Sequence, residues 1–204
     1  GRGFETAASL AARGERAVAA EQQLRDLRIN RVFEGSTEIM HLLIARDAVD
    51  AHLKAAGDLA VADAPWGNKA RAAVKASGFY GRWLPTLAAG KGSVPTAYAE
   101  FGPLAGYLRY ADRASRRLAR STFYGMARWQ ARLEHHQVFL GRIVDIGAEL
   151  FAMSAVCMRA ETLRRRNPEE GAQAYQLAEA FCAQSRVRTE TLFDDLWRNS
   201  DAED

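Results

Sequence analysis

Residues 138–168, VFLGRIVDIGAELFAMSAVCMRAETLRRRNP, decide the fold class of this chain. Apolar side chains recur in them every three or four residues, which is the spacing of one face of an α-helix. The first apolar stripe is formed by Phe139, Ile143, Ile146, Leu150, Met153 and Cys157. A second stripe is formed by Leu140, Val144, Phe151 and Met158. A helix with two apolar faces needs neighbours on both, so we expect it at the centre of a helical bundle.

The pattern around this helix predicts two further long helices. The central helix should end near residues 164–166, because arginines suit a helix C-terminus and Pro168 then breaks the pattern. A second helix should follow and run to about Arg198. A third is predicted after Pro103 from a seam of apolar or small residues three and four apart, namely Leu104, Leu108, Ala111, Ser115, Leu118, Thr122, Gly125 and Trp129. Because no stretch alternates with the period of a strand, the sequence predicts an all-α, up-and-down bundle with little or no sheet.

The N-terminal part of the chain also reads as helical. Short helices are predicted at residues 7–12 and 21–29, and a longer one ends near Gly57. That longer helix should begin at Ser36 or Thr37, because either hydroxyl can cap its N-terminus. Between residues 65 and 103, in contrast, four of the five prolines occur together with many glycines, so we expect a connector made of loops.

Charge and cysteine content exclude several classes of protein. The 28 Lys and Arg residues, 24 of them Arg, are offset by 25 acidic residues, so a net charge of +3 gives no support for nucleic-acid binding. The sequence contains no uncharged run of about 18 residues, so it predicts no membrane-spanning helix. Cys157 and Cys182 provide neither a disulfide framework nor metal-ligand spacing. We therefore expect no metal site, two reduced core cysteines, and a cytoplasmic protein or one peripheral at the membrane.

Five arginines flank the seam of the helix predicted after Pro103. A row of this kind can contact phosphates, but a solvated helix face is the favoured interpretation. The five are Arg109, Arg113, Arg116, Arg117 and Arg120.

One stretch carries chemistry. Residues 25–39, RDLRINRVFEGSTEI, followed by LLIAR at residues 42–46, closely resemble the C-terminal signature of the acyl-CoA dehydrogenase family. The opening GRGF at residues 1–4 resembles the end of that family's Gly-rich loop, which precedes the signature by some tens of residues. Several separate elements occur in the right order, so the resemblance is specific.

The resemblance implies a reaction and assigns residues to it. Family members use FAD to oxidise an acyl-CoA thioester to the trans-2-enoyl-CoA, and Glu34 matches the glutamate that removes the α-proton. The roles in FAD binding fall on Gly1, Ser36 and Glu38, with the Gly-rich loop coming from a neighbouring subunit. At Glu38 relatives often have Asn, Gln or Asp, so a longer carboxylate near phosphates departs from the pattern. The resemblance further implies an electron-transfer flavoprotein or similar acceptor, and at least a homodimer.

The family's domain order also implies a division of the chain. Residues 1–56 would be the end of the catalytic C-terminal domain, carrying the flavin and base segment. Residues 57–103 would be a basic connector containing Gly and Pro. Residues 104–204 would be an extra C-terminal helical bundle, similar in position to that of the very-long-chain branch. Alone, the chain is expected to be inactive; the alternative is a non-catalytic helical interaction or scaffold module that retains the signature.

Residues 64–99 carry five cations interleaved with aromatic side chains and no acidic residue. This mixture suits the interface of an anionic membrane, and the very-long-chain relatives are similar in being membrane-associated through this region. A basic connector packed against protein is the alternative, and it is the favoured one. If the stretch contacts lipid, we expect part of it to be disordered without lipid, because its glycines and prolines favour loops.

Overall fold

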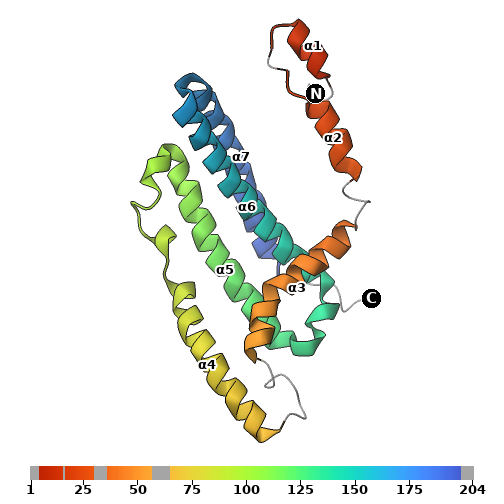
Figure 1. Cartoon of the computed structure of the whole chain (residues 1–204), viewed down its shortest axis with the longest axis vertical. Coiled ribbons are helices and arrows are strands. Elements are labelled where there is room, and N and C mark those ends of the chain that lie inside the picture. The colour runs from red at the N-terminus through yellow and green to blue at the C-terminus, as the bar shows by residue number, and fades with distance from the viewer. Residues whose placement is uncertain (1–4, 16, 30–35, 57–64, 199–204) are drawn as a thin grey trace. The chain divides into compact units, whose positions relative to one another are not determined.

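A computed structural model describes residues 5–15, 17–29, 36–56 and 65–198 of the chain. The chain divides into two compact units, Gly1–Leu43 and Ile44–Asp204. Within the described residues all regular structure is helical and no strand occurs (Figure 1). The predicted all-α helical bundle is therefore confirmed.

The first unit contains α1 (Ala7–Ala12), α2 (Ala20–Ile29) and the start of α3 (Thr37–Ala56). The Thr6 hydroxyl caps α1 by accepting the amide N–H of Ser9 at 3.2 Å. All three helices agree with the predicted ranges. No residue of α1 or α2 is buried, although α2 carries several apolar side chains.

The second unit is built around α5 (Ala105–Trp129), α6 (Gln137–Arg166) and α7 (Pro168–Asp195), which lie side by side in Figure 1. A 3-10 helix, Gln130–His135, joins α5 to α6. Asn167 alone joins α6 to α7, and its side chain caps α7 by accepting the Glu169 amide N–H at 3.1 Å. The end of α6 at Arg166 is as predicted, whereas α7 ends at Asp195, slightly before the predicted limit.

The core of the bundle follows the first apolar stripe of α6, which is buried along its whole length. The second stripe is buried only near the start of the helix, at Leu140 and Val144. Further along it, Phe151 is 76% exposed and Met158 is 61% exposed. The prediction of two buried faces is thus wrong for the C-terminal part of α6, where one face remains at the surface.

Aromatic packing closes the end of the bundle where α5 meets α6. The ring of Phe139 lies 4.7 Å from that of Trp129 and 5.2 Å from that of Trp197, measured between centroids. It also occupies the space where a side chain at Gly125 would be, since a Cβ there would lie 2.6 Å from the Phe139 ring. The small residue in the α5 seam therefore makes room for the largest buried side chain of α6.

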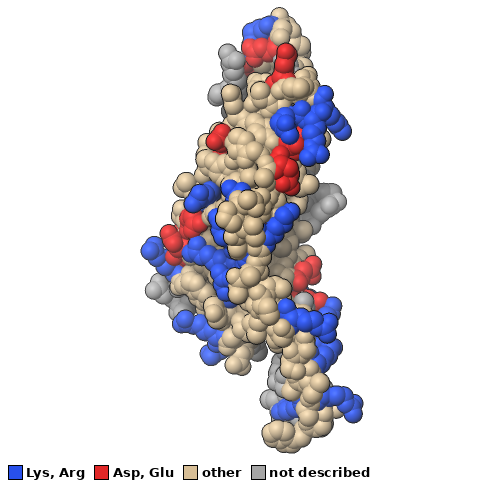
Figure 2. Space-filling model, turned by 90° about the vertical axis from the view of Figure 1, so that its left-hand side faces the viewer, with Lys and Arg blue, Asp and Glu red and all other residues tan. Residues whose placement is uncertain are grey.

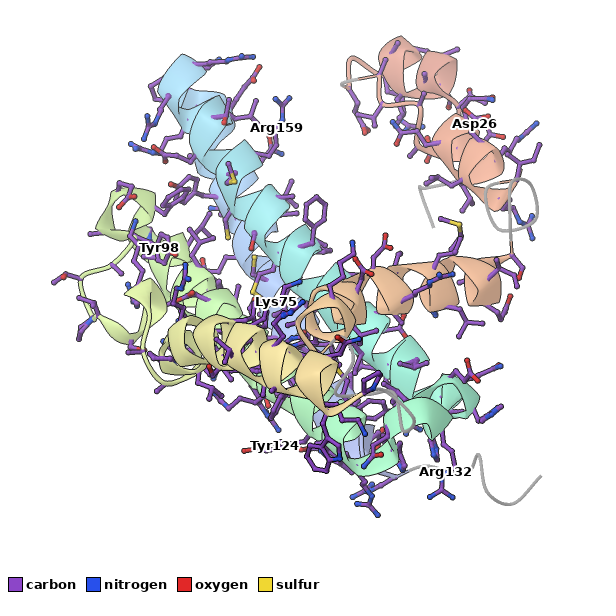
Figure 3. The ribbon with its side chains drawn as sticks, turned by 60° about the horizontal axis from the view of Figure 1, so that its bottom comes forward. Asp26, Lys75, Tyr98, Tyr124, Arg132 and Arg159 are labelled. Carbon is purple, nitrogen blue, oxygen red and sulfur yellow. The ribbon has the colours of Figure 1, made fainter. Side chains whose placement is uncertain are left out.

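A 23-residue helix, α4 (Trp66–Ala88), occupies much of the expected connector. The prediction of loops between residues 65 and 103 is wrong there, because the prolines mark the ends of this helix. Pro65 stands at its N-terminus, where a missing N–H costs least, and Pro85 lies in its last turn. Loops and short 3-10 helices, Lys91–Ser93 and Ala99–Leu104, follow as expected. Tyr98, labelled in Figure 3, precedes the second of these with a positive φ of 63°.

Three arginines of α5 bind this connecting segment, although Arg113 is also exposed to solvent. Arg109 donates to the carbonyl of Ala97 at 2.9 Å, and Arg113 donates to the carbonyl of Gly92 at 2.8 Å. Arg120 donates to the carbonyl of Leu87 in the last turn of α4. The favoured interpretation of this row as a solvated helix face is wrong for Arg109 and Arg120, which are partly buried. Their partners are backbone carbonyls, which a sequence pattern does not reveal.

Candidate functional site

The first residue of the site in the described chain is Ser36, which caps α3. Its hydroxyl oxygen accepts the amide N–H of Ile39 at 3.4 Å, and its carbonyl accepts the amide N–H of Met40 at 3.0 Å. Of the two predicted caps, Ser36 is therefore the one used. Because its oxygen is the acceptor in this bond, the hydroxyl proton stays available for an oxygen of a bound anion.

Glu38 lies in the first turn of α3, and its side chain is exposed. A carboxylate at this position stabilises the positive end of the helix dipole. The same charge opposes an anion placed at that helix end. The position of Glu38 therefore suits an interaction with the helix dipole.

Gly1 and Glu34 lie outside the described residues. Their predicted roles, in FAD binding and in proton removal, stay predictions. Glu34 precedes the capping residue Ser36 by two positions in the sequence, so it is tied covalently to the start of α3.

Apolar side chains are exposed both in the first part of α3 and at the end of α2. Ile39, Met40 and Leu43 are each about half exposed, and α2 exposes Leu27 and Ile29 to a similar degree. Exposed apolar patches on this scale are typical of surfaces that bind another protein segment or a ligand.

The second half of α3 is fixed by a cluster of aromatic rings around His52. The His52 imidazole is only 7% exposed, and its centroid lies 4.6 Å from that of Trp83 in α4. Phe79 and Tyr80 of α4 and Phe123 of α5 complete the cluster. Burial lowers the pKa of His52, which favours the neutral ring at pH 7. The members of this cluster come from three different helices, so no local pattern in the sequence indicates it.

A buried carboxylate, Glu161, joins the ends of α6 and α7. It accepts hydrogen bonds from Arg164 and Arg165 at 2.7 Å each and from the hydroxyl of Tyr175 at 2.5 Å. The Arg164 guanidinium, with the Tyr175 hydroxyl and Arg165, holds the pKa of this carboxyl far below its usual range. The cluster is a structural ion-pair network at a helix junction.

This network predicts an acid-sensitive contribution to stability. Because the pKa of Glu161 is lower in the folded chain than its unfolded value of about 4.3, the carboxylate stabilises the fold above that pH and progressively less below it. Glu161→Gln should therefore lower the unfolding midpoint at neutral pH and reduce the further fall of that midpoint as the pH drops below about 5. Thermal unfolding followed by circular dichroism measures both. Glu134→Gln, at a side chain that is 79% exposed, is the control; equal pH profiles for both variants would contradict the assignment.

The described residues also bear on membrane-spanning helices and on metal sites. No helix among them combines the length and apolar character needed to cross a membrane. No group of three or more His, Cys, Asp or Glu side chains in the same ranges is placed to hold a metal ion.

Comparison with curated proteins finds close relatives along the entire chain. It is 68% identical over 204 residues to the protein named "Probable acyl-CoA dehydrogenase FadE10" of Mycobacterium bovis (strain ATCC BAA-935 / AF2122/97). The proteins of the same name from Mycobacterium tuberculosis strains CDC 1551 / Oshkosh and H37Rv give the same identity. The match covers 100% of this chain and 31% of each relative's length.

No protein-family model and no solved structure matches the chain. The assignment therefore rests on the curated relatives. Their match covers the whole chain, and so both the signature at residues 25–46 and the helical bundle that follows. The chain is the C-terminal portion of an acyl-CoA dehydrogenase and so belongs to that family.

Proposed function

We propose that this chain supplies the catalytic base and part of the FAD site of a dehydrogenase that converts an acyl-CoA thioester to its trans-2-enoyl-CoA. The observation that carries the proposal is the 68% identity over the full 204 residues, a range that contains the Glu34-Gly35-Ser36 signature. Because the chain spans only 31% of those relatives, the activity belongs to a longer protein.

In this proposal Glu34 removes the proton from the α-carbon of the thioester. An ordinary glutamate, with a pKa of about 4.3, is a weak base for such a proton in water. When the acyl chain enters and expels water, the charged carboxylate is desolvated and its proton affinity rises. FAD held at this site would supply the acceptor for the hydride that leaves the β-carbon.

Ser36 suits a role in holding the flavin. Its hydroxyl proton and the first-turn N–H groups of α3 are donors for a pyrophosphate oxygen. Glu38 would face away from the phosphates and act on the helix dipole. Gly1 would approach the flavin of a neighbouring subunit, which requires at least a homodimer. Electrons would then pass to an electron-transfer flavoprotein or a similar acceptor.

The test is anaerobic addition of acyl-CoA thioesters to the full-length protein. We expect a yellow protein whose flavin absorbance is bleached by substrate. The 204-residue chain alone should be helical by circular dichroism, yet colourless and inactive, because most of the flavin pocket lies in other segments. A full-length protein that binds no flavin would instead favour the scaffold-module alternative, and a yellow 204-residue chain would contradict the expected division of the site.

We further propose that α4 contacts anionic membranes as an ordered helix, and not through the partly disordered stretch that the sequence predicts for lipid contact. Its aromatic face packs on His52, while Arg71, Lys75 and Arg82 form an exposed basic face, and Trp66 and Val74 are exposed beside it. Figure 2 shows basic side chains along α4 at the lower end of the view, with no acidic side chain among them. Figure 3 labels Lys75 on this helix. The inward packing of the aromatic residues leaves these cations as the main contribution to lipid binding.

Sedimentation with anionic vesicles tests this proposal in the full-length protein. Each interfacial Lys or Arg contributes roughly 1 kcal/mol that salt removes. Changing Lys69, Arg71, Lys75 and Arg82 to Gln should weaken sedimentation and leave turnover on soluble substrate unchanged. Equal sedimentation of the variant and wild type would leave the protein-packed connector as the correct interpretation.

A further inference from the structure

Cys157 of α6 and Cys182 of α7 face each other in the core of the bundle. Both side chains have 0% exposure, and their sulfur atoms lie 3.6 Å apart. The Cys182 sulfur also lies 3.9 Å from the carbonyl oxygen of Met153, which orients it toward α6. A disulfide bond is about 2.05 Å long, so side-chain rotation and a small helix adjustment must shorten the present separation by roughly 1.5 Å.

The register of α6 against α7 is fixed independently on both sides of the pair. Toward the α6–α7 turn, the Tyr175 hydroxyl donates to Glu161 at 2.5 Å. On the other side, the Ser185 hydroxyl and the Arg188 guanidinium donate to Glu149 at 2.6 Å and 2.8 Å. These contacts place the two cysteines opposite each other whatever rotamers they adopt.

Small residues bring the two helix backbones close together near the turn. A Cβ added at Gly171 would lie 2.4 Å from the Cα of Arg164, so the helices approach as closely there as a missing side chain allows. Ala160 and Ala178 are buried in the same interface. Because the two backbones already lie close together, only a small further decrease in the distance between the sulfur atoms is needed to form the bond.

We propose that Cys157 and Cys182 form a reversible disulfide when the protein meets hydrogen peroxide, linking α6 covalently to α7. The Cys157 thiolate attacks one peroxide oxygen, which gives a sulfenic acid and water after proton transfer. The Cys182 sulfur then attacks that sulfenic sulfur: the S–S bond forms, the S–O bond breaks, and a second water leaves. In total the two thiols lose two electrons and two protons, and peroxide is reduced to two water molecules.

The environment indicates which sulfur reacts first. The hydrogen bond with Cys182 lowers the pKa of the Cys157 thiol, whereas the same contact and burial raise the pKa of Cys182. This contact favours Cys157 as the thiolate, and the 3.6 Å separation of the sulfur atoms places the second thiol within reach of the sulfenic sulfur. Hydrogen peroxide is small and uncharged, so it can reach a buried pair that a bulky reagent cannot. In a reducing compartment such a bond is transient, unlike a structural disulfide of a secreted protein.

The test is graded peroxide treatment of the folded full-length protein, followed by blocking of free thiols, digestion and mass spectrometry. Met158, which is 61% exposed, provides an internal measure of the dose because its thioether is oxidised to the sulfoxide. We expect the peptides with Cys157 and Cys182 to be linked, lighter by two hydrogen atoms, and released by a thiol reductant. We also expect the oxidised protein to unfold at a midpoint higher by on the order of 5 °C.

Cys157→Ala and Cys182→Ala are matched controls that each retain one buried thiol. Circular dichroism establishes that they fold, and neither should form the linked peptide or gain stability on peroxide treatment. The proposal is overturned if Met158 is fully oxidised while both thiols remain free. It is equally overturned if the cysteines gain oxygen atoms without becoming linked, or if the link forms between molecules.

Discussion

Glu34→Gln in the full-length protein is expected to slow the reduction of bound flavin by acyl-CoA by a factor of about 10² to 10⁴. The amide keeps the size and shape of the side chain but cannot accept the α-proton. Flavin content should remain that of the wild type, because Glu34 is assigned to the substrate and not to the cofactor. Stopped-flow measurement of flavin absorbance after mixing with substrate separates this chemical step from later electron transfer.

Two further variants sharpen the test of the base. Glu34→Asp retains a carboxylate on a side chain that is one methylene shorter. It should therefore react faster than Glu34→Gln, whose carboxamide cannot accept the proton. Glu134→Gln changes an exposed glutamate of the helical bundle and should leave the rate unchanged. Flavin reduction at the wild-type rate in Glu34→Gln would show that another group removes the proton.

The second large effect concerns stability: Phe139→Ala is expected to cost about 3–5 kcal/mol of the free energy of unfolding. Phe139 is 0% exposed and packs between Trp129 and Trp197, so its loss leaves a cavity at the end of the bundle. Phe151→Ala is the matched control on the same helix. That side chain is 76% exposed, so its removal should change the free energy by no more than about 0.5 kcal/mol.

Denaturant unfolding of the two variants, followed by circular dichroism, measures both values. Equal losses would mean that the exposed face of α6 contributes as much as the core stripe, contrary to the packing described. A loss at Phe151 that occurs only in the full-length protein, and not in the 204-residue chain, would instead show that another segment covers this face.

Local signals in the sequence were sufficient to predict most helix boundaries. The arginines at residues 164–166 and Asn167-Pro168 act within one helix turn, so the end of α6 agrees with the prediction. Pro65 and Pro85 were misread as markers of loops because a proline at either end of a helix has the same composition signal as one in a turn. The first apolar stripe of α6 was recognisable as core, but the exposure of Phe151 depends on which neighbours are present.

The parts of the candidate site that depend on residues close together in the sequence were predictable. Ser36 caps α3 because its hydroxyl lies three residues before the amide that it accepts, a relation visible in one stretch of sequence. The cluster around His52 was missed because its members come from α3, α4 and α5, and only the fold brings them together. The contacts of Arg109 and Arg120 were missed for the same reason, since their partners are carbonyls more than ten positions away.

The one-residue connection between α6 and α7 has a consequence for how the bundle forms. Because Asn167 alone separates the two helices, the contacts nearest the turn, such as Gly171 against Arg164, join residues close in sequence and need little loop closure. We therefore expect this hairpin to be the folding nucleus, with α4 docking later onto α5 through contacts of longer range. Substitutions at Gly171 should then slow folding, whereas those at Trp83 should chiefly speed unfolding, which stopped-flow refolding and unfolding kinetics would separate.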